Sequence, residues 1–198
     1  ILRTAAASYG KATAYQPIIE LLRAYFELHA PGDPSDIRDK IAGKVLGLDK
    51  NLATTLPALF SLLDVAGDDD AQWRSLAPRQ RRQQTMDAVR HLVLRESQVQ
   101  PVCLVFEDLH WIDAETQAFL DSLVESLPTA RLLLLGNYRP EYQHGWGQKT
   151  YYTQLRLDPL PPASAEALLY RLLGDDAGLE LLKQRLIART QGNPFFLE

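Results

Sequence analysis

The stretch that decides the fold is Leu104-Val105-Phe106-Glu107-Asp108-Leu109-His110-Trp111, in which two acids directly follow an apolar run. A continuous apolar run of this length is typical of a strand that is buried on both faces of a parallel sheet. In an open α/β sheet, ligands bind at the carboxyl ends of the strands. The pair Glu107–Asp108 is therefore predicted to lie where a ligand binds.

The two adjacent carboxylates need compensation. Like charges at the end of a buried strand are costly unless a cation or hydrogen bonds offset them. A Mg²⁺ ion shared between a carboxylate and phosphate oxygens would do so. The alternative is that Glu107 and Asp108 only cap the turn that follows, and their spacing alone does not separate the two interpretations.

The pattern around this stretch predicts a βαβ unit. Asp113 is predicted to cap a helix that runs to Leu127, and Arg131–Gly136 is a second apolar run of strand length. Residues 151–157 are expected to form a further strand, and Ile1–Ala7 a short one. The predicted fold class is α/β, a parallel sheet flanked by helices and followed by a small helical region.

Helical patterns occupy most of the remaining chain. The predicted helices run from Pro17 to about Pro31, from the cap Ser35 to about Leu46, over Asn51–Leu63 with Pro57 as a breaking point, over Pro78–Glu96, from the cap Ser164 onward, and over Leu179–Thr190. Gly67–Asp70 is predicted to be an acidic loop.

The composition of the chain limits its possible partners and its cellular compartment. It has 198 residues, 46% of them hydrophobic and 23% charged, with a formal net charge of −4, which gives no reason to expect nucleic acid or an anionic membrane as a partner. The longest apolar runs are too short to span a bilayer. The single cysteine, Cys103, is compatible with a reducing compartment, and we expect a cytoplasmic location.

Phe106–Asp113 resembles the Walker B stretch of the STAND group of AAA-like P-loop ATPases. More narrowly, it is similar to the predicted-ATPase module found beside class III nucleotide cyclase domains, tetratricopeptide arrays and transcription-regulator domains. Other segments resemble the family's motifs in the family's order: Ser8–Pro17 (after strand 2), Leu133–Glu141 (strand 4 and sensor 1), Gln154–Leu160 (strand 5) and Gly192–Glu198 (the Gly-x-Pro lid motif). The resemblance covers nearly the whole chain and is weakest over 31–100.

The resemblance implies a P-loop NTPase-like sheet of order 5-1-4-3-2, an ATPase core over 1–158 and the start of a helical lid over 159–198. A phosphate-binding loop, Gly-x-x-x-x-Gly-Lys-Ser/Thr, does not occur in the sequence. Gly145–Thr150 has Gln148 where glycine is required, and Gly10-Lys11-Ala12 lacks the hydroxyl residue. We therefore interpret the chain as a fragment that lacks the first strand and its loop.

The absence of a central strand would affect the sheet. Strand 5, at 151–157, would lose its neighbour, and strand 4, at 131–137, would keep an unpaired apolar edge, which is a template for other strands. We expect this edge to be closed by the chain itself, paired with a second copy, or paired with further residues of a longer chain.

The resemblance also implies roles for single residues. Glu107 would hold Mg²⁺ through water, and Asp108 would orient the attacking water beside the metal. Arg139 would sense the γ-phosphate, while Gly192 and Pro194 would pack on the adenine from the lid. The acids stand in the reverse of the commonest AAA order, which argues against fast hydrolysis.

Simpler interpretations stay open. Arg139 can be an ordinary surface arginine, His110 and Trp111 can serve loop packing, and Gly192–Pro194 can be a helix stop followed by a helix start. A basic cluster suggests a solvated helix face more than a DNA contact; it consists of Arg79, Arg81 and Arg82.

The predicted function is an ATP-binding, weakly hydrolysing switch module in a multidomain signalling protein, with a cyclase domain as one option for its partner. Its ligands would be ATP, ADP and Mg²⁺, and its partners other domains of the same polypeptide. One alternative is a regulatory scaffold without turnover, and another is an origin-recognition-like DNA-binding ATPase, which the acidic charge disfavours. We expect the 198-residue chain alone to be inactive and to bind ATP only weakly, so a low-micromolar affinity by calorimetry would contradict this interpretation.

Overall fold

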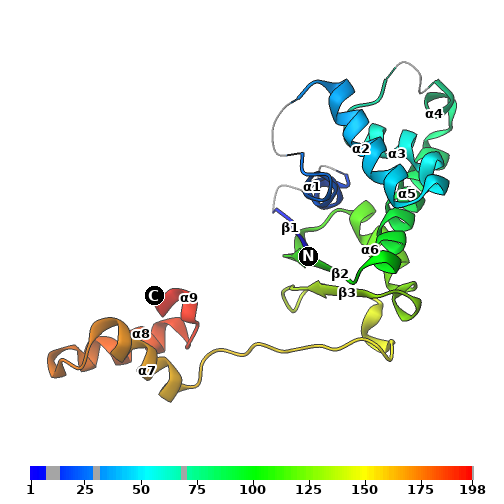
Figure 1. The fold of residues 1–198 in the computed structure, drawn as a ribbon. Coiled ribbons are helices and arrows are strands. Elements are labelled where there is room, and N and C mark those ends of the chain that lie inside the picture. Colours follow the sequence, from blue (N-terminus) through cyan, green and yellow to red (C-terminus); the bar gives the residue numbers. More distant parts are fainter. Residues whose placement is uncertain (8–13, 29–31, 68–70, 198) are drawn as a thin grey trace. The chain divides into compact units, whose positions relative to one another are not determined.

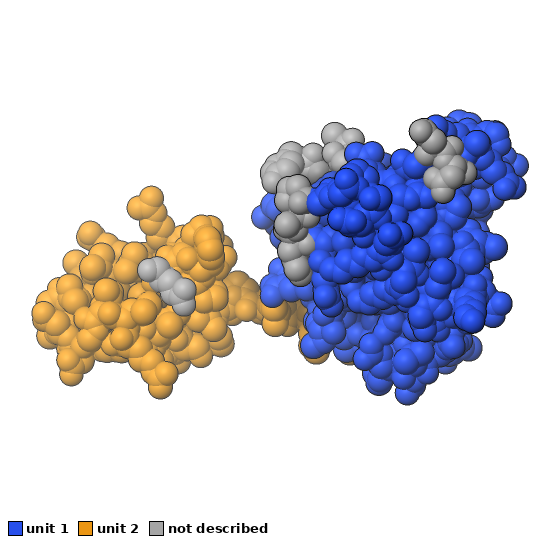
Figure 2. All heavy atoms as spheres, turned by 45° about the horizontal axis from the view of Figure 1, so that its top comes forward, with its two compact units in different colours: residues 1–152 blue, residues 153–198 orange. Residues whose placement is uncertain are grey.

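The computed structural model describes residues 1–7, 14–28, 32–67 and 71–197. They form two compact units, residues 1–152 and residues 153–198, which Figure 2 colours separately. The division of the chain into a core to 158 and a lid from 159 stays a prediction. Among the described residues, no helix has both the length and the apolar character needed to cross a membrane.

The first unit contains a parallel sheet of three strands among its described residues: β1 (Leu2–Ala5), β2 (Val102–Glu107) and β3 (Leu132–Gly136). Their order is β1-β2-β3, and Leu104 of β2 lies between Leu2 and Leu134 in register. This order agrees with strands 2, 3 and 4 of the expected sheet, and the α/β class is confirmed.

Helices cover one face of the sheet. They are α1 (Gln16–Tyr25), α5 (Pro78–Val99) and α6 (Ala114–Val124), which lie on the same side in Figure 1. Leu104 and Phe106 point into this core and are fully buried. On the other face, Leu133 and Leu135 are 59% and 54% exposed. The prediction that β2 is buried on both faces is therefore wrong. The described helices cover only the face of the sheet to which Leu104 and Phe106 belong.

Several further elements of this unit lie next to α5. Contacts with α5 are made by α2 (Pro34–Leu48), the 3₁₀ turn η2 (Lys50–Thr55) and α3 (Leu56–Leu62), and α4 (Ala71–Ser75) precedes α5 in the chain. The predicted break at Pro57 is the point where the 3₁₀ turn η2 ends and α3 begins. Pro57 lies in the first turn of α3, where its missing N–H is not needed. The expected loop at Gly67–Asp70 and the expected end of α1 near Pro31 fall largely outside the described residues, and α1 itself ends at Tyr25.

One predicted helix cap in this unit is wrong and another is confirmed. Asp33, not Ser35, caps α2, because its carboxylate accepts the Ser35 N–H at 2.8 Å. Asp113 caps α6 as predicted, with its Oδ1 accepting the N–H groups of Glu115 and Thr116 at 3.0 Å each. The helix that it caps ends at Val124, and the short turn η4 (Leu127–Thr129) follows.

The strand predicted over 151–157 is wrong. This segment has neither strand nor helix structure, and Leu155 and Leu157 are 83% and 94% exposed. A strand needs a hydrogen-bonded neighbour, and within the described residues β3 pairs with β2 alone. The expectation that the chain closes the β3 edge by itself is therefore also wrong, while pairing with a second copy or with further chain stays a prediction.

The second unit is helical beyond Pro159, as expected. It contains α7 (Pro162–Leu173), the turn η6 (Ala177–Leu179), α8 (Glu180–Thr190) and α9 (Pro194–Leu197). Its small core consists of Ala165, Leu169 and Leu197. Pro161 precedes α7 and Ser164 lies inside it, so the cap predicted at Ser164 is wrong.

Candidate functional site

The carboxyl ends of β2 and β3 lie side by side in the first unit. Phe106 is in register with Gly136, so the segments that follow the two strands leave the sheet together. These segments carry the predicted residues Glu107, Asp108 and Arg139. The sheet thus brings three of the five predicted site residues to one edge.

Asp108 is held by its backbone. It adopts a left-handed conformation with φ 57° and ψ 43°, and its N–H donates to Oδ1 of Asn137 at 2.8 Å. The Asn137 backbone adds two further bonds, because its C=O accepts the Leu109 N–H at 3.0 Å and its N–H donates to the Phe106 C=O at 3.2 Å. Asn137 therefore fixes the turn that presents Asp108.

The carboxylate of Asp108 is left available by this arrangement. It makes no capping hydrogen bond to the 3₁₀ turn that follows, η3 (Leu109–Trp111). Within the described part of the chain, no hydrogen bond or ion pair of this carboxylate is found. The interpretation of Asp108 as a turn cap is therefore wrong, and its oxygens are available for a ligand.

Glu107 has a different environment. Its carboxylate forms an ion pair with the guanidinium of Arg3 on the neighbouring strand β1, and the two side chains are 24% and 71% exposed, respectively. The guanidinium provides the charge compensation that two adjacent acids require. Arg3 was missed in the sequence, because its proximity to Glu107 follows from the pairing of β1 with β2.

The donor set fits Mg²⁺ when phosphate oxygens contribute to its coordination. Mg²⁺ in nucleotide sites is held by one or two carboxylates together with substrate phosphates and water. Glu107 and Asp108 are hard oxygen donors of this kind. No cluster of three or more His, Cys, Asp or Glu side chains occurs among the residues that the structure describes, so protein ligands alone would not form a complete metal cage there.

Arg139 lies against an aromatic side chain. Its guanidinium carbon is 5.3 Å from the centre of the Trp111 ring, within the range of a cation–π contact. The side chain is still exposed and can reach a ligand. Trp111 in turn contacts the His110 ring at 4.5 Å between ring centres, and both ring nitrogens of His110 are buried without a partner.

One arginine of the basic cluster on α5, Arg82, forms an ion pair with α6. Arg82 Nε lies 2.6 Å from Glu115 Oε2, and the Tyr15 hydroxyl donates to the same carboxylate at 3.2 Å. Burial, followed by the charge of Glu115, raises the pKa of Tyr15 to about 12. Arg79 and Arg82 are exposed on α5, in agreement with the expected solvated helix face.

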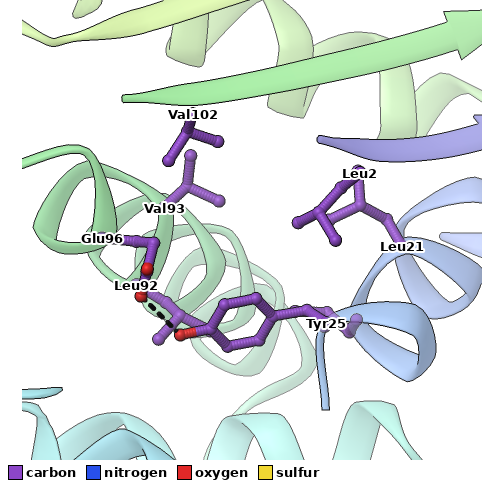
Figure 3. A pocket seen from close by; sticks show the side chains of 8 residues that line it. Leu2, Leu21, Tyr25, Leu92, Val93, Glu96 and Val102 are labelled. Carbon is purple, nitrogen blue, oxygen red and sulfur yellow. Dashed lines mark hydrogen bonds between the residues drawn. The ribbon is translucent and has the colours of Figure 1, made fainter. Parts of the chain in front are cut away.

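Two small pockets accompany the site without adding to its chemistry. One is at the carboxyl end of β1, and it is lined by Ala6, Ala7, Gln16, Pro17, Trp111 and Asp113. The other lies among β1, β2, α1 and α5 (Figure 3). Its lining includes Leu2 and Val102, the first residues of β1 and β2, so it is at the amino ends of the strands, away from the acidic pair. In the second pocket the Tyr25 hydroxyl donates to Glu96 at 2.7 Å, so its two polar side chains satisfy each other.

Gly192 and Pro194 lie in the second unit, and their local role is structural. Gly192 has φ 76°, and a Cβ there would lie 2.4 Å from the Leu160 carbonyl oxygen. Its own C=O accepts the Leu160 N–H at 2.9 Å, and Pro194 begins α9. This geometry is that of a helix stop followed by a helix start, and contact with adenine stays a prediction.

Comparison with known proteins gives one match. A family model described as the AAA ATPase domain matches residues 1–135. The matched region contains β1, β2 and the acidic pair. No curated protein and no solved structure matches the chain.

Proposed function

The chain belongs to the AAA ATPase domain family, and from this premise we propose that Glu107, Asp108 and Arg139 form the metal-binding and γ-phosphate-sensing part of an ATP site. The observation that carries the proposal is the available carboxylate of Asp108, held by Asn137 beside Glu107 at the carboxyl edge of the sheet. A fixed backbone and an unpaired carboxylate leave Asp108 available for a ligand.

The residues would divide the work. Glu107 would hold Mg²⁺ through water, and Asp108 would orient the water that attacks the γ-phosphate. Mg²⁺, when bound, supplies charge neutralisation on the phosphate oxygens. Arg139 adds positive charge where negative charge develops, a contribution that is large in a preorganised site. Its contact with Trp111 limits the conformations of the guanidinium before the ligand arrives.

The wider role that we propose is a nucleotide-dependent switch in a cytoplasmic signalling protein of the STAND type. A longer polypeptide would contribute the phosphate-binding loop, because no such loop occurs in these 198 residues. The strand ahead of that loop would pair with the free edge of β3. Gly192 and Pro194 would contact adenine, and ATP or ADP would set the position of the lid.

The test is turnover of Mg-ATP by this longer polypeptide. Glu107→Gln and Asp108→Asn should each lower the turnover rate by about 100-fold or more, on the scale found when a group that stabilises the transition state is removed. Asp39→Asn on α2 is the matched control, because this exposed acid also loses one charge and lies outside the site. Unchanged turnover in both site variants would contradict the proposal.

A second candidate is nucleotide binding without turnover. The ion pair between Arg3 and Glu107 favours it, since a guanidinium already compensates the acid that would hold the metal. The Glu–Asp order points in the same direction. A wild-type protein that binds ATP and shows no turnover above background would support the second candidate over the first.

A further inference from the structure

A cluster of five rings lies in the segment that contains Arg139, between Tyr138 and Tyr152. We call it the His144 cluster; it consists of Tyr138, Tyr142, His144, Trp146 and Tyr152. The His144 ring stacks on Trp146, with ring centres 4.7 Å apart and an angle of 25° between the planes. Trp146 is buried, whereas no strand and no α-helix fixes this part of the chain.

Hydrogen bonds attach the segment 138–152 to α6. Trp146 Nε1 donates to Asp121 Oδ1 at 2.8 Å, the Tyr142 hydroxyl donates to Gln117, and the Tyr151 hydroxyl donates to the Val124 carbonyl at 3.1 Å. Three side chains of the segment thus contact successive turns of one helix.

Both ring nitrogens of His144 are used within the cluster. Nδ1 accepts the backbone N–H of Trp146 at 3.1 Å. Nε2 lies 3.2 Å from the hydroxyls of both Tyr138 and Tyr152, which are 2.6 Å from each other. The imidazole therefore connects the beginning, the middle and the end of the segment.

This geometry requires one protonation state. An N–H donor faces Nδ1, so Nδ1 must carry a lone pair, and the proton of the neutral ring is on Nε2. Protonation of Nδ1 would place two donors, its own N–H and that of Trp146, against each other. The imidazolium form cannot keep the turn.

We propose that His144 is a proton-sensitive pin that holds the segment 138–152 on α6, and that its protonation in mildly acidic solution releases this segment. Tyr138 directly precedes Arg139, so the release also frees the guanidinium from its position over Trp111. This last step rests on the proposed function of Arg139. The release itself does not.

The groups around His144 set the direction of its titration. The ring faces the hydroxyls of Tyr138 and Tyr152 and the ring of Tyr142 from its own segment, and the charge of Asp121 acts on it from α6. Burial lowers the pKa of His144, and the charge of Asp121 opposes this effect. The unfolded chain then binds the proton more readily than the folded chain, so stability is complete above the usual pKa of about 6.5 and falls as the pH decreases through it.

Nuclear magnetic resonance of the 198-residue chain tests the proposal without nucleotide. At pH 7.5, the ¹⁵N shifts of His144 should report the Nε2–H tautomer. Between pH 7.5 and 5.0, the amide and indole signals of Trp146 should shift or broaden together with the protonation of His144. A ring in the Nδ1–H tautomer, or Trp146 signals that stay constant while His144 titrates, would overturn the proposal.

His144→Asn separates the pin from general acid effects. The Asn side-chain oxygen can accept the N–H two residues later, as in an Asx turn, and it does not titrate in this range. The variant should keep the Trp146 signals in place from pH 7.5 to 5.0, whereas His91→Asn, at an exposed position on α5, should respond like the wild type. An acid response in His144→Asn equal to that of the wild type would refute the inference, and the outcome is independent of ATP turnover.

Discussion

The site depends on two residues that the strands beside β2 position, Arg3 on β1 and Asn137 directly after β3. Glu107 and Asp108 could be proposed from the sequence because they follow an apolar run, and Arg139 could be proposed from the family resemblance, while the roles of all three stay predictions. Arg3 and Asn137 could not, because their roles follow from which strands pair and in which register. Their positions along the sequence carry no signal of this contact.

Arg3 should compete with a metal ion for Glu107. Replacing Arg3 with Gln removes the positive charge that is paired with the Glu107 carboxylate. We therefore expect the affinity for Mn²⁺, used as a probe of the Mg²⁺ site, to rise by about threefold to tenfold, which corresponds to the modest free energy of an exposed ion pair. Titration of Mn²⁺ monitored by paramagnetic relaxation measures this change. Arg23→Gln at an exposed position of α1 makes the same charge change elsewhere and should leave the affinity as it is.

Asn137 should stabilise the turn at Asp108. Replacing Asn137 with Leu leaves the Asp108 N–H without its acceptor, and we expect the free energy of unfolding to fall by about 1 kcal/mol, the typical value of one hydrogen bond. Urea denaturation is the measurement. The control is Gln154→Leu, at an exposed position without helix or strand structure, and equal losses in both variants would show that the turn does not depend on this bond.

Among the helices and strands, the apolar patterns of the sequence predicted where most of them lie but not the residues at which they begin and end. The helix after Asp113 and the strands around it are found as expected, because apolar periodicity extends over many residues. Ser35 and Ser164 do not cap their helices, since Asp33 and Pro161 occupy the positions where the chain enters the helix. The prediction of a strand over 151–157 is wrong for a different reason. A strand forms only beside a neighbouring strand, and the sequence of the segment itself does not show whether such a neighbour is present.

Asp113 connects two elements. Besides capping α6, its Oδ1 accepts the backbone N–H of Tyr15 at 3.1 Å, directly before α1, and Oδ2 accepts the Thr116 hydroxyl at 2.6 Å. Replacing Asp113 with Ala should therefore lower the free energy of unfolding by about 2–4 kcal/mol, because a cap is lost and buried donors lose their acceptor.

Thermal and urea denaturation would measure this loss against Asp33→Ala. Asp33 caps α2 at an exposed position, so its removal should cost only about 1 kcal/mol. If the two variants lose the same stability, the connection between α1 and α6 contributes nothing beyond an ordinary cap.

At the scale of the whole molecule, the sheet is open on one face and along one edge. Leu133 and Leu135 are exposed, and β3 lacks a second neighbour in the part of the chain that is described. Sequence reasoning anticipated the free edge from the resemblance to a five-stranded family. It did not anticipate the open face, because the apolar residues Cys103 and Val105 give β2 the same appearance as a strand covered on both sides.

The division into two compact units predicts where the chain is cut most easily. Arg156 lies near the start of the second unit, in a segment without helix or strand, and its side chain is 85% exposed. A protease needs an extended, accessible backbone, so trypsin under native conditions should cleave after Arg156 early and leave residues 1–156 as a persistent product. Mass spectrometry of the time course identifies the bond. In the Arg156→Gln variant this product should not form. If the wild-type chain instead stays intact, the segment around Arg156 is protected from the protease and the prediction is wrong.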